Sequence, residues 1–186
     1  MLRVTPTELP EVLLVETPLF RDPRGYFEEV WHLAKHSAAG VPESFAQDNL
    51  SVSKRGVVRG LHFQNPRPQG KLVCVLQGTI HDVAVDIRVG SPRFGRHVGI
   101  TLSAEAGQQL YVPEGFAHGF AVTSDTALVL YKCTAPYNAQ GDAGILWNDP
   151  DLGIAWPVGD PLLSAKDQGA PRLRDLDPAR LFVFGR

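Results

Sequence analysis

Two stretches of the sequence carry histidines whose surroundings are suited to proton chemistry. The first is the run Gly56-Val57-Val58-Arg59-Gly60-Leu61-His62-Phe63-Gln64, and the second is Pro113-Glu114-Gly115 followed by His118. Lys71 lies between them. If the fold brings His62, His118 and Lys71 into one cavity, the set suits removal of a proton next to a carbonyl. His62 would be the base, because an ordinary imidazole pKa of ~6.5 lies near operating pH, and the Lys71 ammonium would stabilise the enolate oxygen.

The spacing of both stretches resembles the two sequence signatures of cupin β-barrels. In the first signature a histidine follows a glycine after five residues, as His62 follows Gly56. Gln64 then stands where a second histidine belongs, and Lys71 stands where a glutamate belongs. In the second signature Gly107, Pro113-Glu114-Gly115 and His118 keep the expected spacing, whereas Val122 replaces an asparagine. The spacing of the two signatures therefore matches that of cupins, but the residues at the metal-ligand positions do not.

These replacements argue against a metal centre. A cupin metal site needs lone pairs from two or three imidazoles and a carboxylate. An amide and an ammonium take two of those places here, and a charged lysine offers no lone pair and repels a divalent cation. We therefore predict that no metal is bound, which leaves a metal-dependent cupin oxygenase as a lesser alternative.

The elements that must position these residues are short strands. Apolar, β-branched runs bounded by turn residues predict strands over 71–76, 79–88, 98–102, 109–112 and 127–132. The alternation within 79–88 is typical of a strand with one buried face. A short helix is expected over 28–36, a turn over 177–180, and a loop or helix start over 164–167. The pattern predicts an all-β, cupin-type jelly roll (double-stranded β-helix) with short peripheral helices, as one domain over residues 1–186.

Composition and charge exclude several classes of protein. The chain has 186 residues, of which 44% are hydrophobic and 20% charged, and its net charge of -2 offers no basic field for nucleic acid or an anionic membrane. No apolar run approaches the ~20 residues of a membrane span, and the N-terminus lacks the layout of a signal peptide. Cys74 and Cys133 lie in apolar runs and are expected to be buried free thiols. We expect a cytoplasmic protein with neither nucleic acid nor membrane as partner.

Several stretches taken together resemble a more specific family, the dTDP-4-dehydrorhamnose 3,5-epimerases, over about residues 16–173. They are residues 20–29, 47–51, 56–64, 69–73, 113–120, 131–132, 144–150 and 163–167. The resemblance implies an isomerase that converts dTDP-4-dehydro-6-deoxy-D-glucose to dTDP-4-dehydro-L-rhamnose, for cell-surface polysaccharide, by epimerisation at C3 and C5. Both carbons flank the C4 ketone, so the reaction needs no cofactor. The sequence agrees, because it has no glycine-rich dinucleotide motif.

The resemblance also implies a role for each matched residue. His62 corresponds to the base, Asp167 to the carboxylate that orients it, Lys71 to the enolate stabiliser, and Tyr131 to the acid that reprotonates the opposite face of the sugar. Arg24, Arg59 and Lys166 correspond to nucleotide contacts, and Tyr137 to the aromatic ring that stacks on thymine. The remaining expected substrate contacts are Phe20, Glu29, Gln47, Asn49, His118 and Asp142. Asp142 departs from the family, which commonly has a glutamate there, so its reach toward the nucleotide is in question.

Oligomeric state follows from the same resemblance. Family members are homodimers in which N-terminal strands are exchanged, so that residues 20–29 reach the partner's pocket. Independent support comes from the apolar run 12–15, which could pair at the edge of a sheet.

Other interpretations remain open at this point. An epimerase that acts at C3 or C5 alone, in a secondary-metabolite pathway, would use the same base, lysine and nucleotide contacts. A non-catalytic, sugar-binding cupin would use the same cavity. Single residues also have ordinary interpretations: Tyr131 as a core residue, and Arg24 and Arg59 as surface charges. His81 and His97 are expected to be barrel or surface residues.

Overall fold

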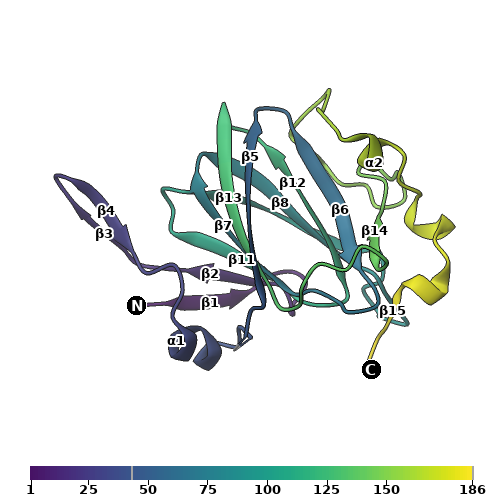
Figure 1. Cartoon of the computed structure of the whole chain (residues 1–186), viewed down its shortest axis with the longest axis horizontal. Coiled ribbons are helices and arrows are strands. Elements are labelled where there is room, and N and C mark those ends of the chain that lie inside the picture. Colours follow the sequence, from purple (N-terminus) through teal and green to yellow (C-terminus); the bar gives the residue numbers. More distant parts are fainter. Residues whose placement is uncertain (43, 186) are drawn as a thin grey trace.

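Two antiparallel β-sheets packed face to face form the body of the protein (Figure 1). The computed structural model describes residues 1–42 and 44–185. One sheet has the order β1 (Arg3–Pro6), β2 (Leu13–Glu16), β11 (Gln108–Val112), β7 (Lys71–Gln77), β13 (Thr126–Cys133) and β5 (Gln47–Lys54). The other has the order β10 (His97–Ser103), β8 (Thr79–Asp86), β12 (Phe116–Val122), β6 (Val58–Gln64) and β14 (Asp142–Gly144). The predicted all-β, cupin-type architecture is confirmed.

The remaining elements are short and lie at the periphery. A hairpin of β3 (Leu19–Asp22) and β4 (Gly25–Glu28) projects from the body as an arm, which Figure 1 shows beside the N-terminus. The helices are α1 (Leu33–Ala38), α2 (Ala165–Gln168) and two 3₁₀ turns, η1 (Leu173–Asp175) and η2 (Pro178–Arg180). Strand β15 (Phe182–Val183) pairs with β9 (Arg88–Val89). Within the described residues, no helix has the length and apolar character needed to cross a membrane.

The helix expected over 28–36 is wrong at its start. Glu28 pairs with Leu19 as the last residue of β4, and the helix begins only at Leu33. The glycine at position 25, with φ of 130°, supplies the turn that makes residues 19–28 a hairpin. Two other local expectations are confirmed, since residues 178–180 form a 3₁₀ turn and Ser164 caps α2.

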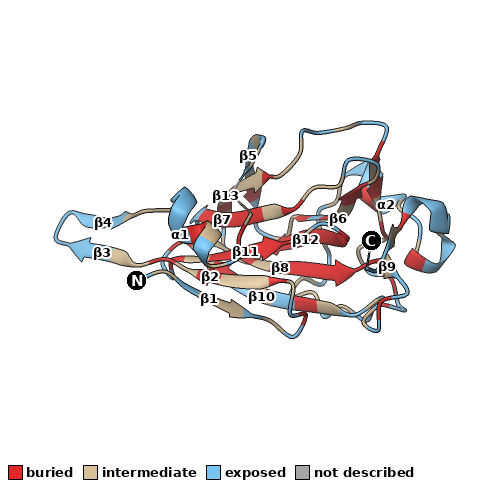
Figure 2. Ribbon diagram, turned by 90° about the horizontal axis from the view of Figure 1, so that it is seen from below, coloured by how far each residue is buried: buried red, intermediate tan, exposed pale blue. Residues whose placement is uncertain are grey.

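Successive side chains of each strand point alternately into the space between the two sheets and toward the outer face of their own sheet. Val73 and Val75 of β7, Val129 of β13 and Ile80 of β8 belong to the core between the sheets. The outer face of β8 is buried as well, because Val83 and Val85 pack under the C-terminal segment with Leu152, Leu173 and Leu181. The expectation of one buried face for this strand is therefore wrong, and red colouring along β8 in Figure 2 shows the burial.

Two further expectations concern the cysteines and the run 12–15. Cys74 and Cys133 are buried free thiols, as predicted. Strand β2 does not lie at an edge, because β1 pairs on one side of it and β11 on the other. The edges of this sheet are β1 and β5.

Close contact between two glycines sets the spacing of β6 and β12. A Cβ atom added at Gly119 would approach the Arg59 carbonyl oxygen to 2.7 Å and the Gly60 Cα to 3.1 Å. Neither neighbour can move away without shifting β6, because both are backbone atoms. The two strands carry His62 and His118, which lie opposite each other in register. A larger residue at position 119 would thus displace both histidines.

We predict that Gly119→Ala destabilises the protein by ~1–3 kcal/mol through overpacking, which lowers Tm by ~2–4 °C for each kcal/mol in a chain of this size. Gly159→Ala is the matched control, because a Cβ at Gly159 meets no atom within 4 Å. Thermal unfolding followed by circular dichroism measures both variants. Equal Tm values for the two would contradict the assigned strand contact.

Candidate active site

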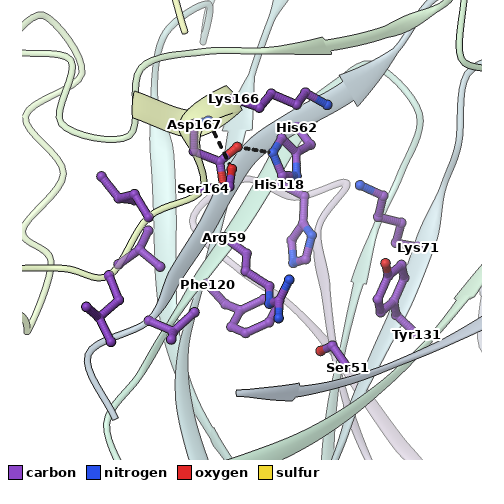
Figure 3. A pocket seen from close by; sticks show the side chains of 14 residues that line it. Ser51, Arg59, His62, Lys71, His118, Phe120, Tyr131, Ser164, Lys166 and Asp167 are labelled. Atoms are coloured by element: carbon purple, nitrogen blue, oxygen red, sulfur yellow. Dashed lines mark hydrogen bonds and ion pairs between the residues drawn. The ribbon is translucent and has the colours of Figure 1, made fainter. Parts of the chain in front are cut away.

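A cavity of about 440 Å³ opens between the two sheets, large enough for a small-molecule ligand. Its wall comes from β5, β6, β7, β12, β13 and the segment that leads into α2 (Figure 3). Seven residues predicted from the sequence line it: Arg59, His62, Lys71, His118, Tyr131, Lys166 and Asp167. The structure therefore brings together all four predicted catalytic groups and three of the predicted substrate contacts.

An imidazole and a buried carboxylate form the most distinctive pair in the cavity. The Nε2 atom of His62 lies 2.6 Å from Oδ1 of Asp167. Asp167 is only 4% exposed, and its backbone N–H donates to the Ser164 hydroxyl that caps α2. Burial alone raises the pKa of the Asp167 carboxyl. The hydrogen bond from His62 and contacts with Gly60 and Ser164 together lower this pKa by more than burial raises it, so it lies below its ordinary value. Asp167 is therefore a charged acceptor at neutral pH.

This acceptor determines which nitrogen of His62 is basic. A carboxylate accepts only, so Nε2 of the ring carries the proton it donates to Asp167. The lone pair of the neutral ring then lies on Nδ1, which is free to take a proton from a ligand. The His62 side chain is 32% exposed, and its imidazole is accessible from the cavity.

An irregularity in β6 places Arg59 and His62 on the same side of the strand. His118 is in register with His62 and Phe120 with Arg59, so three residue steps on β6 face two on β12. In a regular strand, residues three apart point to opposite faces. The extra residue forms a β-bulge, a feature that re-aims side chains next to sites. Both Arg59 and His62 consequently line the cavity.

Lys71 and Tyr131 extend from the six-stranded sheet, across the cavity from His62 (Figure 3). Burial lowers the pKa of the Lys71 ammonium below its ordinary value. Burial raises the pKa of the Tyr131 phenol, and the charge of Arg59 opposes that rise only in part. The phenol thus keeps its proton at neutral pH and can act as a donor.

A second imidazole–carboxylate pair was not predicted from the sequence. The Nε2 atom of His118 lies 2.7 Å from Oδ1 of Asp82, which has no exposed surface. Asp82 lies on β8 between Ile80 and Ala84, two residues of the core. The sequence does carry a signal for Asp82. It lies two residues from Ile80 and two from Ala84, so on a strand its side chain points to the same face as these core residues. This pair fixes His118 beside His62.

Several of the predicted substrate contacts are linked in a chain of hydrogen bonds beside the cavity. Gln47 Nε2 donates to Asn49 Oδ1 at 2.8 Å, and the Tyr137 N–H donates to Gln47 Oε1 at 2.8 Å. The Tyr137 hydroxyl donates to Asp142 Oδ2 at 3.1 Å, and Lys166 Nζ lies 2.5 Å from the same oxygen. Tyr137 is 59% exposed. Asp142 therefore reaches Tyr137 and Lys166 despite its shorter side chain.

Gln64, at the position of a cupin metal ligand, supports this chain. Its Oε1 accepts the Asn138 N–H at 2.8 Å, and its Nε2 donates to the Pro136 carbonyl at 3.1 Å. It pins the loop that carries Tyr137. In the part of the chain that the structure describes, no group of three or more His, Cys, Asp or Glu residues is arranged to hold a metal ion.

Three predicted substrate contacts lie away from this cavity. Phe20 and Arg24 belong to the β3–β4 arm and Glu29 follows it, and none of them is among the cavity residues. Arg24 pairs with Asp22, and Glu29 pairs with Lys35 at 2.7 Å. Within one chain, the structure does not bring these residues to the site.

The His62 tautomer is directly measurable. We predict that histidine ¹⁵N NMR shows the Nε2–H tautomer for the neutral ring, because Asp167 accepts that proton. In Asp167→Asn the preference should weaken, since a neutral amide no longer favours the N–H at this position. A predominant Nδ1–H tautomer in the unchanged protein would contradict the geometry.

Comparison with known proteins identifies relatives along nearly the whole chain. The model of the family described as dTDP-4-dehydrorhamnose 3,5-epimerase matches residues 6–175. The dTDP-4-dehydrorhamnose 3,5-epimerase of Methanothermobacter thermautotrophicus is 47% identical over 176 residues, 93% of this chain and 95% of that protein. The dTDP-4-dehydrorhamnose 3-epimerase of Streptomyces niveus is 43% identical over 162 residues, 86% of this chain and 78% of that protein.

A solved structure extends the likeness to three dimensions. The dTDP-6-deoxy-D-glucose-3,5-epimerase of Legionella pneumophila, crystallised with dTDP-4-keto-L-rhamnose, superposes with a TM-score of 0.97 at 42% identity. The match covers 100% of both chains.

Proposed function

This chain belongs to the dTDP-4-dehydrorhamnose 3,5-epimerase family, and we propose that it epimerises dTDP-4-dehydro-6-deoxy-D-glucose at C3 and C5 to dTDP-4-dehydro-L-rhamnose. It is thus an isomerase acting on a dTDP-linked 4-keto sugar. The observation that carries the proposal is the 2.6 Å His62–Asp167 pair in a cavity that also holds Lys71 and Tyr131.

Proton removal is the first step. Nδ1 of His62 takes the proton from a carbon next to the ketone, and the C–H electron pair moves into the ring to form an enolate with its charge on the C4 oxygen. Asp167 stabilises the imidazolium that forms, because its carboxylate already accepts the other N–H. Lys71 stabilises the oxygen where negative charge develops.

Proton return on the opposite face completes each inversion. The Tyr131 phenol gives its proton to the carbon, and the C4 ketone re-forms as the enolate electrons return. The tyrosinate then regains a proton and His62 loses one, by exchange with water, so the enzyme is restored without a redox change. Both C3 and C5 flank the same ketone, so one set of groups can serve both positions.

Nucleotide binding is assigned to the positively charged and aromatic groups near the cavity. Arg59 offers a guanidinium fork to diphosphate oxygens, and Lys166 adds a second cation. Tyr137, with its exposed ring, stacks on thymine, while Gln47, Asn49 and His118 contact the remainder of the substrate. Asp142 orients Tyr137 and Lys166, to which it is already bonded.

The chain would form a homodimer, in which the exposed residues of the β3–β4 arm contact the partner. Phe20 and Phe27 on the arm are 60% and 69% exposed, and Leu50 and Val52 on edge strand β5 are 60% and 64% exposed. Monomeric soluble proteins rarely expose large contiguous apolar surfaces, so this exposure favours a partner that covers these residues. In a dimer with exchanged N-terminal strands, Phe20, Arg24 and Glu29 would complete the partner's cavity.

The two buried free thiols favour a cytoplasmic location, where cysteines stay reduced.

Epimerisation at one carbon remains the second candidate. The relative from Streptomyces niveus bears the name of a 3-epimerase and is 43% identical. The proposed base, acid and lysine serve either outcome, because the number of inversions depends on how the ring is seated. We favour two inversions because the 47% identical relative is named a 3,5-epimerase.

Deuterium exchange counts the carbons that react. We predict that the protein, mixed with dTDP-4-dehydro-6-deoxy-D-glucose in deuterated water, incorporates deuterium at both C3 and C5, as read by NMR and mass spectrometry. Exchange at one carbon alone would establish the single epimerase instead. If neither C3 nor C5 exchanged, the proposed function would be wrong.

Two substitutions separate the base from its support. His62→Asn should abolish turnover and leave the Kd for dTDP near its original value, because the nucleotide contacts are elsewhere. Asp167→Asn should lower kcat less severely, by less than the about 10²–10⁴-fold that a positioned general base contributes, since it weakens the base without removing it. Normal turnover in His62→Asn would contradict His62 as the base, whereas binding of dTDP without any turnover by the unchanged protein would leave a sugar-binding protein as the explanation.

A further inference from the structure

The hydroxyl of Ser51 is buried in the wall of the cavity. It lies in the middle of β5, where Asn49, Ser51 and Ser53 turn inward while the residues between them are exposed. Among the described residues, no hydrogen-bond partner reaches its Oγ atom. Most buried hydroxyls in proteins are hydrogen-bonded, so an unpartnered one beside a ligand cavity calls for an explanation. The hydroxyl can turn between staggered positions about one bond without moving the strand.

The neighbours of Ser51 on β5 locate this hydroxyl with respect to the proposed chemistry. Ser53 accepts a hydrogen bond from Arg59 Nε at 3.0 Å, which leaves the outer nitrogens of the guanidinium for a ligand. In the other direction, Asn49 is in register with Tyr131. Two residues along a strand span ~7 Å, so Ser51 lies midway between the Arg59 and Tyr131 positions. Figure 3 shows its oxygen turned into the space between these two side chains.

This order along the strand corresponds to an order along the sugar. The diphosphate, assigned to Arg59, is attached at C1, and the ketone lies at C4, near Lys71 and Tyr131. C2 lies between C1 and the reacting C3, and it carries a hydroxyl. The C2 hydroxyl takes no part in either inversion and C2 keeps its configuration, which makes this hydroxyl a suitable point for holding the ring.

We propose that the Ser51 hydroxyl binds the C2 hydroxyl of the sugar and positions the ring between Arg59 and the reacting groups. This assignment rests on the proposed function. It makes Ser51 a specificity-determining residue, because a 2-deoxy sugar would leave the serine without a partner inside the cavity. A site built around such a hydrogen bond discriminates against an analogue that lacks the hydroxyl.

The experiment is a two-by-two comparison of protein and substrate. The kcat/KM values are measured for the unchanged protein and Ser51→Ala, each with dTDP-4-dehydro-6-deoxy-D-glucose and with its 2-deoxy counterpart. Ser51→Ala should lower kcat/KM about tenfold for the 2-hydroxy substrate, as expected for loss of one hydrogen bond, and leave the 2-deoxy substrate unaffected. Ser37→Ala is the matched control, because Ser37 Oγ in α1 is also buried and finds no partner among the described residues, but lies outside the cavity.

Two outcomes would overturn the assignment. An equal loss on both substrates would mean that Ser51 acts on the cavity as a whole, and no loss on either would mean that it does not touch the sugar. Because Ser51 Oγ has no partner to lose among residues 1–42 and 44–185, Tm should be the same in Ser51→Ala and the unchanged protein. A lower Tm together with equal losses would point to a structural role.

Binding without chemistry separates this inference from the proposed function. Isothermal titration with dTDP-glucose and dTDP-2-deoxyglucose repeats the comparison, and neither compound can be epimerised because neither has a ketone. If the unchanged protein turns over no 4-keto substrate but Ser51→Ala weakens binding of dTDP-glucose alone, the proposed function fails and the Ser51 assignment stands. Equal Kd changes for both compounds would overturn the assignment.

Discussion

A charged carboxylate held out of water beside an imidazole is the interaction on which the rest of this site depends. Asp167 is 4% exposed and lies 2.6 Å from His62. A buried charge is costly unless it is paired and hydrogen-bonded, so the ring, the Ser164 cap of α2 and the carboxylate have to be placed together. Once they are, the imidazole has one available lone pair, directed away from Asp167. The chemistry then depends on what the cavity presents to that nitrogen.

The two sheets perform this placement with few specialised features. Strands β6, β7, β12 and β13 each contribute apolar residues to the core and one or two polar residues to the cavity; on β7, Lys71 precedes Val73 and Val75. On β6, the bulge turns Arg59 and His62 to the same side, and the contact of Gly60 with Gly119 brings β12 close enough for His118 to lie opposite His62. The cavity is thus the polar half of the same interior whose other half is the hydrophobic core.

Much of the fold and the site could be predicted from the sequence, for physical reasons that also explain the failures. Strand periodicity and turn residues identify the five predicted strands of the body, and glycine-bounded spacing identifies His62, Lys71 and His118. Burial of both faces of β8 depends on a C-terminal segment distant in sequence, so alternation within the strand cannot reveal it. The hairpin at 19–28 depends on pairing across Gly25, which overrides a weak helical pattern. Asp82 and Ser51 become visible only when neighbouring strands show which side each residue faces.

The most direct test of His62 as the base is a crystal structure with a bound dTDP-linked 4-keto sugar, or with an unreactive analogue of it. The account predicts Nδ1 of His62 within ~3–3.5 Å of C3 or C5, the Tyr131 hydroxyl on the opposite face of the ring, and Nε2 still bonded to Asp167. A ring seated with His62 and Tyr131 on the same face, or with His62 Nδ1 bonded to the diphosphate, would contradict it.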